Sequence, residues 1–159
     1  MTELEQTGSD IADLVMPRGV IAQLRAPTKR QVLQELARRA AAMTGIADKR
    51  IFDALAERER LGTTGIGAGI AIPHCRLPEL GRLHGMFARL ERPVPFDAID
   101  DQPVDLVFLL LAPAGADAEH LKALARVSRL LRDRATCEKL RGANSADALY
   151  ALLTGGAAG

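Results

Sequence analysis

An apolar run from Val104 to Leu111, interrupted only by Asp105, constrains the fold more than any other feature of the chain. A strand with one face in water alternates apolar and polar residues, whereas a strand covered on both faces is apolar almost throughout. Pro113 and Gly115 should end this strand. The chain is therefore expected to build a sheet with helices packed against both of its faces.

The rest of the chain supplies the other elements of such a fold. Shorter apolar segments predict an edge strand at Val20–Ala22 and further strands at Ile70–Ile72 and Leu83–Leu90. Pro93 and Pro95 should break the last of these strands. Apolar residues at helical spacing predict helices over residues 29–43, 48–60, 118–132, 136–141 and 146–153. Helices first, strands in the middle and helices again indicate an α/β fold with a mixed β-sheet flanked by α-helices on both faces.

Two of these helices carry residues suited to an N-cap, Thr28 and Ser145. The helix over residues 118–132 is expected to bury one face, made of Leu121, Leu124, Ala125, Ser128 and Leu131. We expect a single domain over residues 12–154, preceded by a flexible polar lead-in over residues 1–11 and followed by a disordered tail over residues 155–159.

Composition excludes several classes of protein. The net charge is +1 over 159 residues, so the chain lacks the basic excess typical of nucleic-acid-binding proteins. The apolar run around residue 108 is too short to span a bilayer, and the start of the chain has no signal-peptide pattern. We therefore expect a cytoplasmic protein without membrane insertion, in which Cys75 and Cys137 are free thiols.

Residues 62–69 form a glycine-rich segment that cannot be a stable helix. No Gly-Lys-Ser/Thr follows it, and Ile70 stands where a dinucleotide fingerprint needs its third glycine. One interpretation is a flexible turn between a helix and a strand. The other is a phosphate-binding or partner-binding loop, whose candidate residues are Thr63, Thr64, Gly65, Gly67 and Gly69.

His74 is the strongest candidate for chemistry, because it follows Pro73 at the end of a predicted strand. Neutral imidazole is the side chain best suited to act as a nucleophile at about pH 7. His120 falls near the start of the long helix, where Asp117 could be the N-cap and the helix dipole favours an anion. It could stabilise a phosphate on His74 or be an ordinary exposed histidine, and the acidic Asp117 and Glu119 argue against phosphate binding.

We expect no metal and no cofactor, because the histidines and cysteines show no paired ligand spacing. Cys75 adjoins His74, but neighbours in a strand point to opposite faces, so the two should not form a thiol–imidazole pair. His84 lies inside a predicted strand and matches no motif, which makes it a useful control.

Residues 58–74, with the sequence RERLGTTGIGAGIAIPH, closely resemble the phosphohistidine signature of the mannitol/fructose-type enzyme IIA domains of the bacterial phosphotransferase system. Residues 95–106, PFDAIDDQPVDL, and the later pair His120-Leu121 look like the nitrogen-regulatory branch of that family. Thr63 stands where serine is common, and Ala68 where asparagine is often found.

This resemblance implies a mannitol-type IIA fold and a role for three residues. His74 falls on the phosphorylated histidine, with either ring nitrogen as the acceptor, while His120 and Arg58 fall on residues near the phosphate. Phosphate would arrive from a phosphorylated HPr-like carrier, itself supplied by enzyme I, and no metal or nucleotide would take part.

The resemblance leaves three functions open. In the nitrogen-regulatory branch, the phosphorylation state controls binding to target proteins such as kinases or transporters. In the sugar-transport branch, a fructose- or mannitol-specific IIA domain passes the phosphate to a IIB domain. The sequence contains no IIB or membrane IIC segment, which favours regulation. A third hypothesis is a binding module in which His74 no longer accepts phosphate.

Overall fold

The computed structural model describes residues 11–155, so most of the predicted lead-in and tail lies outside the described residues. In chain order the elements are β1 (Val15–Leu24), α2 (Lys29–Thr44), α3 (Asp48–Leu61), β2 (Gly65–Gly67), β3 (Ile70–Ala71), β4 (His74–Arg76), β5 (His84–Val94), β6 (Val104–Ala112), α4 (Asp117–Arg132), α5 (Arg134–Gly142) and α6 (Ala146–Thr154).

The strands form one mixed sheet in the order β1-β5-β6-β3-β2, with β4 also paired to β6. The apolar run is β6, the central strand, which lies antiparallel to β5 and parallel to β3 and β4. The prediction of a mixed sheet is confirmed, and so is the edge position of β1, although β1 is longer than the segment predicted.

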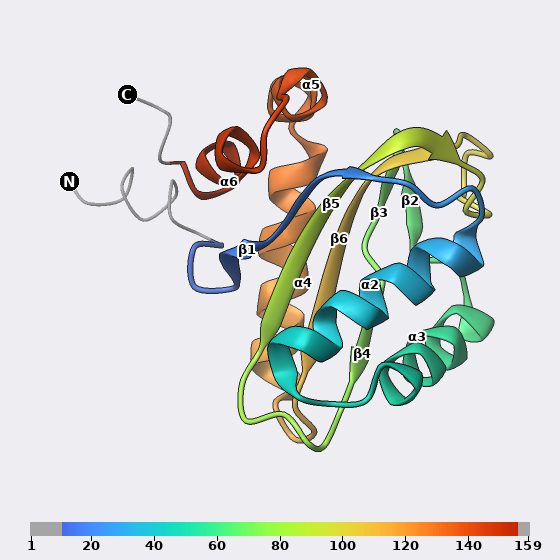
Figure 1. Cartoon of the computed structure of the whole chain (residues 1–159), viewed down its shortest axis with the longest axis vertical. Helices are drawn as coiled ribbons and strands as arrows, with labels where there is room; N and C mark the ends of the chain where they lie inside the picture. The colour runs from blue at the N-terminus through green and yellow to red at the C-terminus, as the bar shows by residue number, and fades with distance from the viewer. Residues whose placement is uncertain (1–10, 156–159) are drawn as a thin grey trace.

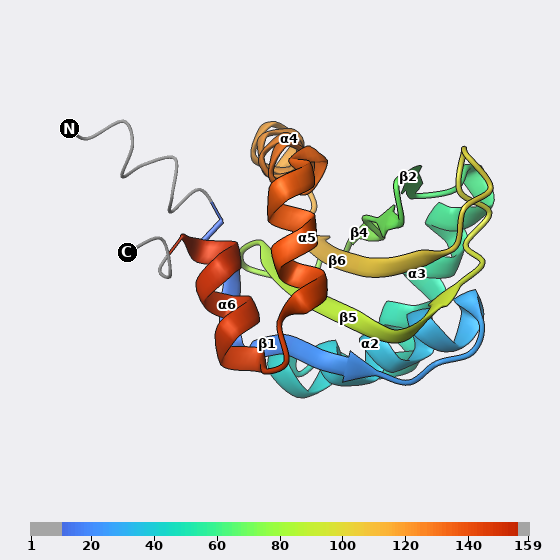
Figure 2. The ribbon, with the colours of Figure 1, turned by 90° about the horizontal axis from the view of Figure 1, so that it is seen from above.

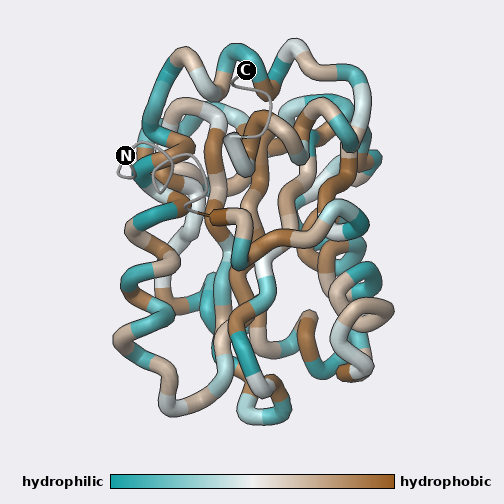
Figure 3. Tube along the Cα trace, turned by 90° about the vertical axis from the view of Figure 1, so that its left-hand side faces the viewer, coloured by the Kyte–Doolittle hydropathy of each residue, from teal (hydrophilic) through white to brown (hydrophobic). Residues whose placement is uncertain are grey.

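Helices cover both faces of this sheet, as the apolar run predicted (Figures 1 and 2). Successive residues of β6 point alternately into two cores: Leu109 packs with α2 and α3, and Phe108 packs with α4, α5 and α6. Hydrophobic residues accordingly concentrate along the central strands of the trace (Figure 3). Cys75 and Cys137 are free thiols buried in different cores.

Both predicted N-caps are confirmed, because the hydroxyl oxygens of Thr28 and Ser145 accept hydrogen bonds from backbone N–H groups one turn ahead, each over 3.1 Å. The predicted N-cap Asp117 is wrong. Asp117 is the first residue of α4, and the cap residue Ala116 makes no side-chain cap.

Three further predictions need correction. β5 continues through Pro93 to Val94, because a register shift between Arg89 and Val94 accommodates a residue without an N–H group. The glycine-rich segment contains the short strand β2, which pairs with β3, rather than a turn alone. His74 follows the end of β3, as predicted, but it also opens a further short strand, β4, that the sequence did not predict.

The predicted buried face of α4 is only partly right: Leu131 is buried and Leu124 is partly buried against the core. The buried residues of α4 are His120, Ala123, Val127 and Leu131. Leu121 is 67% exposed, because the helix is rotated so that His120 faces inward. Leu121 is apolar but lies on the surface, where it lines the same cavity as the two histidines.

Candidate functional site

The two candidate histidines lie side by side at one end of the sheet. His74 begins β4, which runs parallel to β6, and β6 leads into α4, whose first turn carries His120. The ring centroids are 5.5 Å apart, and the ring planes meet at 76°. The fold therefore joins two histidines that are 46 positions apart in the sequence.

The backbone fixes the tautomer of His74. Its Nδ1 lies 2.8 Å from the carbonyl oxygen of Ile72. A carbonyl oxygen can only accept, so the neutral ring carries its proton on Nδ1. The lone pair of Nε2 is then free to act as the nucleophile.

Burial keeps both imidazoles neutral. Burial lowers the pKa of His74, and the positive charge of Arg58 lowers it further. The hydrogen bond from Nδ1 to Ile72 raises this pKa but does not outweigh burial. The pKa of His120 is also lowered, first by burial and then by the nearby His74 and Arg76. At about pH 7 both imidazoles are therefore uncharged, the form in which an imidazole nitrogen can act as a nucleophile.

His120 carries an unsatisfied polar atom. The residue is 5% exposed, yet its Nε2 makes no hydrogen bond with any of residues 11–155. A buried polar group without a partner is costly, and in a native structure such a group calls for an explanation. A ligand oxygen bound between the two rings would provide the missing partner.

The rings lie in a cavity of about 640 Å³ formed by α3, β4 and α4. It is lined by Arg50, Asp53, Ala54, Glu57, Arg58, Leu61, His74, Cys75, Arg76, His120, Leu121 and Leu124. The structure thus brings together the three residues that the resemblance selected. Leu61 and Leu121, on opposite sides of the cavity, are 81% and 67% exposed.

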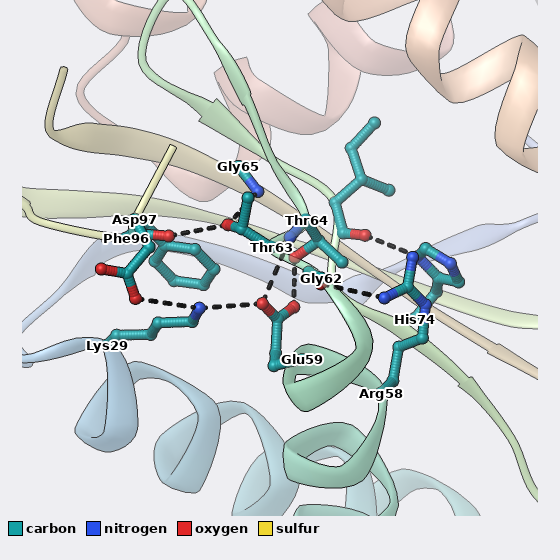
Figure 4. A network of polar contacts seen from close by, with 11 residues as sticks. Lys29, Arg58, Glu59, Gly62, Thr63, Thr64, Gly65, His74, Phe96 and Asp97 are labelled. Atoms are coloured by element: carbon teal, nitrogen blue, oxygen red, sulfur yellow. Dashed lines mark hydrogen bonds and ion pairs between the residues drawn. The ribbon is translucent and has the colours of Figure 1, made fainter. Parts of the chain in front are cut away.

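The three arginines of the cavity are held differently. Arg50 and Arg76 form ion pairs with Glu79 and Asp117, over 3.0 and 3.1 Å. Arg58 donates to the carbonyl oxygen of Gly62 over 3.0 Å and has no carboxylate partner among the described residues (Figure 4). Its positive charge is therefore the one best placed to meet an incoming anion.

Sequence reasoning missed Arg76, Ile72 and the exposed leucines. Arg76 could have been found, because a residue two positions after His74 in a strand points to the same side of the sheet. The role of Ile72 is carried by its backbone carbonyl, which leaves no signal in residue types.

The glycine-rich loop is not part of the cavity lining. The hydroxyl of Thr63 donates to the carbonyl of Phe96 over 2.8 Å, and the hydroxyl of Thr64 donates to Glu59. At Gly69 the φ angle is 81°, and a Cβ would lie 2.9 Å from Asp105. The two threonine hydrogen bonds anchor the loop to the rest of the fold.

Other candidate groups stay outside the chemistry. Burial raises the pKa of Cys75 to about 12, so this thiol is not a nucleophile even though it adjoins His74. His84 is half-buried at the start of β5 and does not line the cavity.

Within residues 11–155, no cluster of three or more potential ligands could hold a metal ion. Of the helices described, none is long and apolar enough to cross a membrane.

Comparison with known proteins gives a consistent result. A sequence model of the family described as "Phosphoenolpyruvate-dependent sugar phosphotransferase system, EIIA 2" matches residues 14–155. A nitrogen regulatory protein of Bradyrhizobium diazoefficiens is 54% identical over 143 residues, which are 90% of this chain and 94% of that protein.

Solved structures agree with these matches. The nitrogen regulatory protein IIA-Ntr from Neisseria meningitidis has a TM-score of 0.87 at 32% identity, covering 92% of this chain and 100% of that chain. IIA mannitol from Escherichia coli shares the fold, with a TM-score of 0.73 at 21% identity over 87% of this chain and 97% of that chain. The resemblance and the mannitol-type fold inferred from the sequence are thus confirmed, and the chain belongs to the EIIA type 2 family of the phosphoenolpyruvate-dependent sugar phosphotransferase system.

Proposed function

We propose that this protein is a regulatory phosphoryl carrier of a nitrogen-type phosphotransferase system, working in the cytoplasm. It accepts phosphate on Nε2 of His74 from a phosphorylated HPr-like protein, which enzyme I phosphorylates in turn. One observation carries this proposal: His74 presents a free Nε2 lone pair beside the buried, unsatisfied Nε2 of His120.

The transfer needs only positioning and charge stabilisation. Nε2 of His74 attacks the phosphorus of the donor phosphohistidine in line. A new N–P bond forms as the donor's N–P bond breaks, and that electron pair stays on the donor imidazole. His120 and Arg58 donate hydrogen bonds to the phosphoryl oxygens as their charge develops. The proton on Nδ1 remains hydrogen-bonded to Ile72 throughout.

The surface around the cavity suits a protein donor. Leu61 and Leu121 are large apolar side chains exposed on either side of the histidines, where a docking partner would bury them. Phosphate on His74 would add about −1.5 to −2 charges between them. A target with an Arg cluster would then be recruited, and one with an acidic patch repelled.

Incubation with phosphoenolpyruvate, enzyme I and HPr tests the carrier role by mass spectrometry. One acid-labile phosphoryl group should appear on the wild type. A chain that stays unmodified in the presence of all three would instead be a binding module without phosphoryl transfer.

A transport role is the alternative, in which the phosphate passes to a sugar-specific IIB domain. The match to nitrogen regulatory proteins over most of the chain favours regulation. Partners captured from cell extract by His74→Ala and by the phosphorylated wild type should differ and include kinases or transporters. Rapid transfer to a sugar IIB domain, at a rate that matches sugar uptake, would support transport instead.

A further inference from the structure

We propose that Glu59 and Lys29 are positioning residues that hold His74 in the tautomer able to accept phosphate, acting through Thr64 and Ile72. The kinetic part of this inference rests on the proposed function, whereas the tautomer itself can be observed without any phosphoryl transfer.

The network begins at a buried carboxylate in the last turn of α3. The side chain of Glu59 is 7% exposed and accepts hydrogen bonds from both the backbone N–H (3.2 Å) and the hydroxyl of Thr64 (Figure 4). A carboxylate at a helix C-terminus faces the negative end of the helix dipole. Helix stability therefore does not explain Glu59, and its contacts with Thr64 do.

Lys29 compensates the charge of this carboxylate. Its Nζ lies 2.9 Å from Glu59, and its side chain is 20% exposed at the first residue of α2. The same Nζ lies 4.9 Å from the centroid of the Phe96 ring and 3.5 Å from Asp97. A buried carboxylate without such a partner is strongly destabilising, and Lys29 supplies that partner for Glu59.

The contacts continue from Thr64 to the reactive imidazole. The carbonyl of Thr64 accepts the N–H of Ile72 over 3.0 Å. The carbonyl of Ile72 in turn accepts the Nδ1 proton of His74 over 2.8 Å. Both polar groups of Ile72 are thus used, one to fix its place and the other to fix the histidine. If Ile72 shifts, no acceptor keeps the proton on Nδ1, and a share of the molecules will carry it on Nε2.

The same helix end also places Arg58. Arg58 lines the cavity and contacts Gly62, while the neighbouring Glu59 reaches the strand segment that leads to His74. The last turn of α3 therefore sets both the charge that meets the phosphate and the nitrogen that attacks it. Loss of the Glu59 anchor should lower the catalytic rate without changing the exposed docking surface.

The first experiment measures the His74 tautomer by ¹H–¹⁵N NMR in the unphosphorylated protein. The wild type should show a protonated Nδ1 and an unprotonated Nε2. Glu59→Gln and Thr64→Val should both give a mixture of tautomers. Thr64→Ser, which keeps the hydroxyl, and Glu35→Gln, which removes a carboxylate paired with arginines on α2, should retain the wild-type spectrum.

The second experiment measures phosphorylation by phospho-HPr. Glu59→Gln and Lys29→Met should lower kcat by about 10-fold or more with KM for phospho-HPr unchanged, because the reacting nitrogen is misplaced and the docking surface is not. Lys29→Arg, which keeps the charge, should recover most of the rate. Glu35→Gln should match the wild type.

The two experiments separate the possible failures. A wild-type tautomer in both Glu59→Gln and Thr64→Val would overturn the positioning role, as would a loss of thermal stability with an unchanged kcat. If Glu59→Gln does not fold, the pair Thr64→Val and Thr64→Ser decides the question. If the variants shift the His74 tautomer but the wild type accepts no phosphate, the positioning role of Glu59 is supported and the carrier function is refuted.

Discussion

The two ends of strand β6 carry polar clusters of opposite character. At the start of β6, Arg141 donates to both carboxylate oxygens of Asp105 and to the carbonyl of Ala68, all within 2.9 Å. Near its other end, Nε2 of His120 has no partner among the described residues, and Arg58 contacts only a carbonyl. The first cluster satisfies its polar groups and fastens α5 to the glycine-rich loop, whereas the second leaves the Nε2 atom of His120 unpartnered. An unsatisfied buried polar atom thus distinguishes the histidine end of β6 from the Arg141 end.

The largest effect is expected at His74. His74→Ala removes the attacking nitrogen, so phosphorylation by phospho-HPr should be lost completely. The circular dichroism spectrum and melting temperature should stay close to the wild type, because the side chain is only half-buried. Acid-labile phosphate on the variant would show that another residue is the acceptor.

The next largest effect is expected at the donors beside it. His120→Ala and Arg58→Ala each remove one charge-stabilising donor and should slow phosphorylation by about 10²–10³-fold. Rapid-quench kinetics measures this directly, with His84→Ala as the control because His84 does not line the cavity. Wild-type rates in both variants would remove these two residues from the site.

Replacing Arg141 should lower the stability of the fold but not the rate of phosphorylation. Arg141→Met leaves Asp105 without its partner, and the free energy of unfolding should fall by about 1–2 kcal/mol, an amount reduced by the partial exposure of the pair. The rate of phosphorylation should be unchanged. Urea denaturation measures the stability, and the phosphoryl-transfer assay measures the rate. A variant that is phosphorylated slowly but is as stable as the wild type would contradict the difference between the two ends of β6.

The smallest expected effect is a pH dependence of stability that arises from the two histidines of the cavity. Burial lowers the pKa of both His74 and His120 below their ordinary value of 6.5. The unfolded chain therefore binds more protons than the folded one as the pH falls through 6.5, and stability decreases below that pH. Urea midpoints between about pH 7 and pH 5.5 should fall for the wild type and fall less for the His74→Gln/His120→Gln variant. Equal slopes would show that the two rings are not held neutral by the fold.

The sequence predicted the layers of this fold better than the details of the site. The nearly continuous apolar run of β6 is typical of a doubly covered strand, and the caps Thr28 and Ser145 were visible as residue types. The face of α4 was misjudged because Leu121, exposed beside the cavity, was counted as a core residue. Its surface position follows from the rotation that buries His120.

Some parts of the site could be predicted from the sequence and others could not. His74 was identifiable from its neighbours in the sequence, and the resemblance added His120 and Arg58. The contact that selects its nucleophilic nitrogen was not identifiable, because it runs through the carbonyl of Ile72 and depends on the pairing of distant segments. Residue types carry no information on such backbone contacts.

The most direct test of the central claim is to locate the phosphate on the imidazole of His74 by ¹H–¹⁵N and ³¹P NMR of the phosphorylated protein. The structure predicts phosphorus on Nε2 and a proton on Nδ1, still hydrogen-bonded to Ile72. Phosphorus on Nδ1 of His74, or on any other residue, would contradict the account.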